Sequence, residues 1–187
     1  MRCIIFAIII VLSGQLHADS PARQTARVTA SNLGSAYFVM APKKQHLLNG
    51  VLKLKGDAHG KAFKLNEAGG SKLLWEVSGW YAFSVFISDD GKYLVRMGNW
   101  AQGIAPSEED LAVSFYKEGV EIRRYSTKEL VKNPADVKRT TSHYFWQAEE
   151  LDLPMLNWNN EFRVKTIDGY LYVFDIESGN LISSDKQ

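Results

Sequence analysis

The chain of 187 residues has little cysteine and, beyond its first residues, no long apolar run. The apolar run at positions 3–12 is shorter than the roughly 20 residues that a membrane-spanning helix needs. It follows Arg2 and precedes the small residue Ala18, an order typical of a cleaved secretory signal peptide. We therefore predict a signal peptide at residues 1–18 and an exported protein with no stable membrane anchor after cleavage.

The only cysteine, Cys3, lies inside this predicted signal peptide, so the processed chain would have no thiol and no disulfide. Cys3 begins the apolar run rather than following it, which argues against a lipoprotein cleavage site. The sequence also has no Asn-x-Ser/Thr glycosylation motif. Export without a disulfide framework or such a motif favours a bacterial protein, periplasmic or secreted.

Excess charge of either sign is also missing, because the formal net charge is only +1. Cleavage after Ala18 removes Arg2, one of the 22 basic residues, and no acidic residue. The basic residues that remain then equal the 21 acidic residues in number. A neutral chain has no long-range attraction for nucleic acid or for an anionic membrane. Four basic residues cluster locally, and we interpret them as a solvated face: Arg123, Arg124, Lys128 and Lys132. The sequence therefore predicts no nucleic-acid partner.

Recognisable catalytic and metal-binding motifs are absent as well. No serine lies in a Gly-x-Ser-x-Gly elbow. Beyond the signal peptide, His46, His59 and His143 are widely spaced and form no metal-ligand pattern. The glycine-rich stretch 56–62 has three residues between its glycines where a phosphate-binding loop has four. We therefore assign no catalytic residue, no metal site and no cofactor.

What the sequence does contain is apolar runs separated by turn residues. Four such pairs predict β-hairpins, at 47–52, 83–97, 111–125 and 162–176. Alternation of apolar and polar residues within 120–125 and 162–167 predicts half-buried strands. The stretch 80–87 is almost wholly apolar and predicts a central strand covered on both faces. About ten or eleven strands are expected.

Helix signals are confined to one place. Ser126 to Glu129 fits a capping box, and the turn that it begins should end near Asn133, which can cap a second short turn starting at Pro134. The predicted fold class is all-β and antiparallel, as a sandwich, an open barrel or a small propeller-like sheet array with one or two short helical turns. We expect a flexible start at 19–26 and a single domain at 27–187.

Two of these stretches resemble a known architecture. Residues 87–95, Ile-Ser-Asp-Asp-Gly-Lys-Tyr-Leu-Val, resemble the inner hairpin of β-propeller blades, and residues 173–182 resemble the outer strand and turn of such blades. Gly91 and Gly169 lie 78 residues apart, about twice a blade length of roughly 40 residues. The resemblance implies a propeller of at most about four blades. The chain also resembles uncharacterised exported β proteins of bacteria, which implies no activity.

Aromatic residues supply the candidate binding site. Large rings dominate β cores, so most of the five tryptophans should be buried. Trp100 follows Asn99 in a loop-like stretch, where a ring flanked by amides is suited to a sugar or a peptide. In residues 142–146 alternate side chains face opposite sides, so either the odd-numbered or the even-numbered residues line a groove. The candidate ligand-binding residues are Asn99, Trp100, His143 and Trp146.

These observations favour an exported, non-catalytic binding or scaffolding protein of the bacterial envelope, whose partner is an envelope protein or a glycan. One alternative is a hydrolase of an envelope polymer, with His143 and an acid, Glu149 or Asp90, as general acid and base. Another is a structural subunit that assembles with its own copies into a homo-oligomer.

Overall fold

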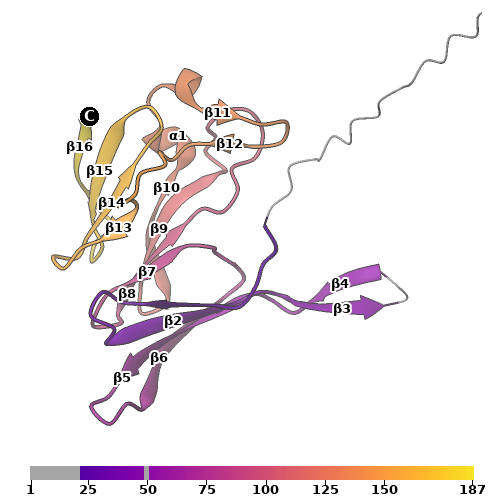
Figure 1. The fold of residues 1–187 in the computed structure, drawn as a ribbon, viewed down its shortest axis with the longest axis vertical. Helices are drawn as coiled ribbons and strands as arrows, with labels where there is room; N and C mark the ends of the chain where they lie inside the picture. Colours follow the sequence, from indigo (N-terminus) through magenta and orange to yellow (C-terminus); the bar gives the residue numbers. More distant parts are fainter. Residues whose placement is uncertain (1–21, 49–50) are drawn as a thin grey trace, which may run out of the picture.

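The computed structural model describes residues 22–48 and 51–187 and is built almost wholly from antiparallel strands (Figure 1). Sheet I contains β1 (Arg27–Ala30), β2 (Ala36–Ala41), β5 (His59–Leu65) and β6 (Ser71–Ser78). Sheet II contains β7 (Val85–Ile87), β8 (Tyr93–Met97), β9 (Leu111–Lys117) and β10 (Val120–Ser126). Sheet III contains β13 (Met155–Leu156), β14 (Glu161–Lys165), β15 (Tyr170–Asp175) and β16 (Leu181–Lys186). In each sheet the spatial order follows the chain order.

Two small hairpins complete the β structure: β3 (Lys44–Leu48) with β4 (Val51–Lys55), and β11 (Lys138–Arg139) with β12 (Tyr144–Phe145). The all-β prediction is confirmed, and within the described residues the sheets form an array rather than a closed barrel. All four predicted hairpins are present, although the Asn-Gly turn of the first lies outside the described residues. The sixteen described strands exceed the expected ten or eleven, because strands of two residues leave no readable alternation in the sequence.

Sheet II lies between the other two sheets and contributes to two separate cores. Leu94 belongs to the core shared with sheet I, whereas its neighbour Val95 belongs to the core shared with sheet III. Their exposed fractions are 1% and 0%, because successive residues of β8 face opposite sheets. At the centre of the array β7 contacts both β1 and β13, the first strands of the other two sheets.

The strand predicted at 80–87 is wrong in extent. Only its last three residues, β7, join a ladder, and β7 is an edge strand of sheet II. The preceding residues are held in a loop by the Asn99 side chain, whose Nδ2 donates to the Tyr81 carbonyl and whose Oδ1 accepts from the Phe83 amide. The strands covered on both faces are β8 and β9.

The first hairpin of each large sheet has the same kind of turn. Each turn begins with a residue whose side-chain oxygen accepts a hydrogen bond from an amide at the start of the next strand: Ser31, Ser88 and Asn157. Three positions later each has a residue with positive φ: Gly34 (70°), Gly91 (76°) and Asn160 (59°). Gly169 instead lies between the second and third strands of sheet III, so the 78-residue spacing does not relate equivalent turns.

The helical prediction is confirmed. In α1 (Thr127–Leu130) the Ser126 Oγ accepts from the Glu129 amide at 3.3 Å, and a carboxylate oxygen of Glu129 accepts from the Ser126 amide at 2.6 Å. Asn133 caps the 3-10 turn η1 (Pro134–Asp136). Leu130 is buried in the core between sheets II and III, so these turns cover one end of that core. Among the described residues no helix has the length and apolar character needed to cross a membrane.

Candidate functional site

The candidate site forms where the loop after β8 meets the segment that contains β12. Gly98 begins this loop with its amide bonded to the Ala112 carbonyl at 2.9 Å. A Cβ at Gly98 would lie 1.7 Å from the Leu111 carbonyl oxygen, so only glycine allows the loop to pass this close to β9. Further along, the Ala101 carbonyl accepts from the Tyr144 amide at 3.3 Å. The backbone therefore fixes the loop against the β12 segment.

Three aromatic rings pack against one another at this junction. The rings of Trp100 and His143 have centroids 3.8 Å apart at an angle of 33°, and the Phe145 ring meets His143 edge-on at 4.8 Å. His143 is only 3% exposed, and its Nδ1 lies 2.5 Å from the Thr140 hydroxyl. His143 is thus held inside the stack, with Trp100 and Phe145 on its outer sides.

All four predicted ligand-binding residues line a single hollow of about 140 Å³. The sequence places Asn99 and Trp100 more than 40 positions from His143 and Trp146, and the fold brings the two pairs together. This hollow is smaller than the roughly 300–1,000 Å³ of ordinary ligand sites. Taken alone, it accommodates only part of a larger ligand.

The four residues contribute in different ways. Both polar atoms of the Asn99 amide are used by the Tyr81–Phe83 backbone, so Asn99 positions the loop. Trp146 is 6% exposed and packs into the core between sheets II and III, forming the floor of the hollow. Trp100 is half-buried and is the predicted residue whose ring remains accessible.

Two residues outside the predicted set, Phe145 and Gln147, have a larger share in the site. Both also line two neighbouring hollows, of about 560 and 380 Å³, together with Glu149. We call these three hollows, which share Phe145 and Gln147, the aromatic groove. Phe145 is 44% exposed at its centre.

The alternation in 142–146 already offered Phe145 as one of the two alternatives for lining a groove, and its extension to 149 would have added Gln147 and Glu149. Along this stretch the even-numbered Tyr144 and Trp146 are buried, whereas Phe145, Gln147 and Glu149 are accessible. His143 is the exception among the odd-numbered residues, because Trp100 covers it. Trp100 belongs to a loop that is distant in the sequence, so the residues around His143 do not predict that its ring is covered.

The structure does not assemble the acid–base pairs considered for a hydrolase. Glu149 lines the two larger hollows but not the one that His143 lines. Asp90 lies in the β7–β8 turn, where it accepts from the Ser88 hydroxyl at 2.6 Å and from the Lys92 amide at 3.0 Å. Partial burial raises the pKa of Asp90, but these hydrogen bonds outweigh it, and the net pKa is lowered. Asp90 is not among the residues that line the hollow beside His143.

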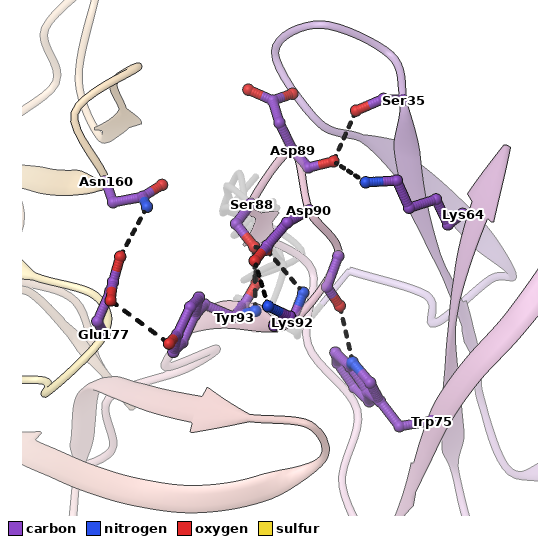
Figure 2. Close-up of polar contacts among 11 residues, drawn as sticks. Ser35, Lys64, Trp75, Ser88, Asp89, Asp90, Lys92, Tyr93, Asn160 and Glu177 are labelled. Carbon is purple, nitrogen blue, oxygen red and sulfur yellow. Dashed lines mark hydrogen bonds and ion pairs between the residues drawn. The ribbon is translucent and has the colours of Figure 1, made fainter. Parts of the chain in front are cut away.

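The β7–β8 turn instead joins the three sheets, as Figure 2 shows. From sheet I, the Ser35 hydroxyl donates to the Asp89 carbonyl at 2.6 Å, and the Trp75 indole N–H donates to the Gly91 carbonyl at 2.7 Å. On the other side, the Tyr93 hydroxyl lies 3.5 Å from the carboxylate of Glu177 at the end of sheet III. The Asp89 carboxylate also accepts from the Leu33 amide at 2.8 Å, so both neighbouring carboxylates of this turn, Asp89 and Asp90, hold backbone amides in place.

Two further chemical classes were considered from the sequence. Across residues 22–48 and 51–187, no three His, Cys, Asp or Glu side chains are grouped so as to hold a metal ion. In the basic cluster, Arg124 pairs with Glu121 at 2.6 Å and Lys128 pairs with Glu108 at 2.9 Å. Both basic side chains of these pairs are solvent-exposed, although Glu121 is half-buried, which agrees with the interpretation of this cluster as a solvated face.

We compared the chain with known proteins. No protein-family model matches it, and no curated protein matches its sequence.

Proposed function

We propose that the chain is an exported, non-catalytic binding protein of the bacterial envelope and that the aromatic groove is its binding surface. The observation that carries this proposal is the convergence of Trp100, His143 and Phe145 from two distant segments on one set of hollows. An aromatic stack whose outer ring remains 44% exposed leaves apolar area available to a ligand.

The lining of the groove favours a glycan. A sugar ring has apolar faces that pack on aromatic rings and hydroxyl groups that need amide or carboxylate partners. Phe145 supplies the ring, while Gln147 and Glu149 supply a half-buried amide and an exposed carboxylate along the same side. A succession of open hollows suits an extended polymer better than a small compact molecule.

A catalytic role has less support. His143 is enclosed by Trp100 and Phe145, and Glu149 lines neighbouring hollows rather than the one beside the imidazole. Hydrolysis of a glycosidic bond needs two carboxyl groups facing each other across the bond. Around Phe145 the groove has only the adjacent acids Glu149 and Glu150, on one segment.

The test is a calorimetric titration that measures the affinity of the processed protein for soluble fragments of envelope glycans. Phe145→Ala should weaken binding about tenfold, because it removes the accessible ring. The matched control is Trp158→Ala, which removes a ring that is 75% exposed in the β13–β14 turn, and it should leave the affinity unchanged.

Equal loss of affinity in both variants would contradict the assignment of the groove, and so would the absence of saturable glycan binding. A cross-linked pull-down tests the remaining possibility, which is that the partner is a protein. One stoichiometric envelope protein, lost with Phe145→Ala, would keep the groove as the site but replace the glycan.

A further inference from the structure

The β3–β4 hairpin is an insertion between β2 and β5 of sheet I. Ala41 at the end of β2 pairs directly with His59 at the start of β5. The β2–β5 pairing of sheet I is therefore complete without the residues inserted between them. The hairpin extends away from the three large sheets (Figure 1), and among the described elements its only extensive contacts are between its own two strands. An isolated two-stranded hairpin is marginally stable in water, so a partner outside the chain is expected.

Its strand register separates basic from apolar residues. Next to the body Lys44 pairs with Lys55 and His46 pairs with Lys53, with the uncharged pair Gln45 and Leu54 between them. At the far end the last two register positions hold only aliphatic residues: Leu47 with Leu52, and Leu48 with Val51. The hairpin thus has a basic base and an apolar far end.

Among the residues that the structure describes, no ion pair involves Lys44 or Lys55. Lys44 and Lys55 are both exposed, and like charges directly opposite each other across a sheet are destabilising. No acidic residue occurs between positions 42 and 56. The next acid, Asp57, lies 3.8 Å from Lys43 in an exposed pair, which contributes little.

We propose that the β3–β4 hairpin docks reversibly on an anionic lipid surface, with its apolar end entering the headgroup region and its lysines beside the lipid phosphates. Each lysine near such a surface contributes about 1 kcal/mol, equivalent to about fivefold in affinity. This attraction is local, since charges are screened within about 8 Å at physiological ionic strength, so it needs no net charge on the whole protein. A soluble polyanion would satisfy the lysines but would offer the aliphatic pairs no apolar phase.

The experiment is co-sedimentation of the processed protein, isolated after expression of the full chain, with vesicles of phosphatidylglycerol and phosphatidylcholine or of phosphatidylcholine alone. We expect binding to the anionic vesicles only, weakened by high salt. Lys44→Gln with Lys55→Gln should reduce the affinity roughly 20- to 30-fold. Leu47→Ser with Leu52→Ser should reduce it at least about tenfold.

The matched control is Lys72→Gln with Lys186→Gln, which removes the same charge from exposed strands of sheets I and III and should keep most of the binding. Unchanged thermal unfolding of every variant shows that the fold is retained. The proposal is overturned if anionic vesicles are not bound or if both hairpin variants bind like the parent. Equal binding to inorganic polyphosphate with no effect of the leucine changes would also overturn it, since lipid would then be unnecessary. None of these outcomes depends on the aromatic groove.

Discussion

At the scale of single residues, the buried polar groups connect segments that are distant in sequence. Asp168, which is 4% exposed in the β14–β15 turn, accepts from the Lys132 amide at 2.7 Å and from the Asn133 amide at 2.8 Å. These bonds attach the chain after α1 to sheet III. In the sequence Asp168 is only an aspartate before a turn glycine, so its long-range role could not be predicted.

Asp168→Asn tests this attachment. Both amides donate to Oδ2, so the asparagine carbonyl can still accept from them, but loss of the negative charge weakens both hydrogen bonds. The new NH2 group takes the place of Oδ1, which is buried without a hydrogen-bond partner, so the free energy of unfolding should fall by about 1.5–3 kcal/mol. Urea denaturation followed by circular dichroism measures the change. Asp152→Asn, at an exposed position, should have little effect; a similar loss in both variants would mean that charge alone is responsible.

Two buried tyrosines make stability depend on alkaline pH. Burial raises the pKa of Tyr144 from 10.0 to about 12, with a further contribution from the Asp110 carboxylate. Burial likewise raises the pKa of Tyr172 to about 12, assisted by the charge of Asp168. The Tyr172 hydroxyl donates to the Leu130 carbonyl and so holds the end of α1.

The sign of the pH effect follows from proton binding. Above pH 10 these tyrosines lose protons in the unfolded chain while the folded chain retains them until about pH 12. Their contribution to stability is therefore complete below pH 10 and is lost between pH 10 and pH 12. Urea midpoints measured at pH 9 and pH 11.5 should show the decrease, and Tyr172→Phe should reduce it. A variant with the same decrease as the parent would show that other groups cause it.

At the scale of secondary-structure elements, local signals predicted what local interactions form. The capping box at Ser126 and the hairpin turns were readable because their hydrogen bonds join residues only a few positions apart. The β11–β12 pair, only two residues long in each strand, and the loop at 80–84 were not readable. Both depend on partners elsewhere in the chain, such as the Asn99 amide that holds the loop.

Replacement of residues 44–55 by a short Gly-Ser linker tests the independence of the β3–β4 insertion. Because Ala41 and His59 are already paired, the linker spans a short distance, and shortening the loop favours folding slightly. The free energy of unfolding should stay within about 1 kcal/mol of the parent. Chemical denaturation measures it.

The contrasting change is replacement of Ser88–Gly91 by a linker of equal length. It removes the side chains of this turn that accept from the Leu33, Lys92 and Tyr93 amides. Without them the turn no longer holds its backbone carbonyls in place for the donors of sheet I, so the change should cost more than about 2 kcal/mol. If the two linker variants were equally destabilised, the insertion would be part of the folded body.

At the scale of the whole molecule, sheet II decides whether the array behaves as one unit. Its two faces belong to different cores, and adjacent residues such as Leu94 and Val95 contribute to opposite sides. Loss of packing on one face therefore disturbs strands that support the other. We expect the single domain predicted at 27–187 to unfold as one cooperative unit.

Leu94→Ala tests this coupling. Truncation of a leucine that is 1% exposed should destabilise the protein by about 2–5 kcal/mol. Calorimetry should still show one transition, with equal calorimetric and van't Hoff enthalpies. Two separate transitions, one shifted by Leu94→Ala and one not, would show that sheets I and III unfold independently.

The sequence by itself determined the class of the fold, the main hairpins, the helical cap and the set of aromatic residues worth testing. Alternation, turn residues and capping motifs act over a few positions, so they are visible without a fold. The tertiary structure alone decided that Trp100 covers His143, that the hollows beside Phe145 and Gln147 adjoin the one beside Trp100, and that the β3–β4 hairpin has no extensive contact with another described element. These features depend on how distant segments pack, and the residues involved carry no local pattern that specifies their partners.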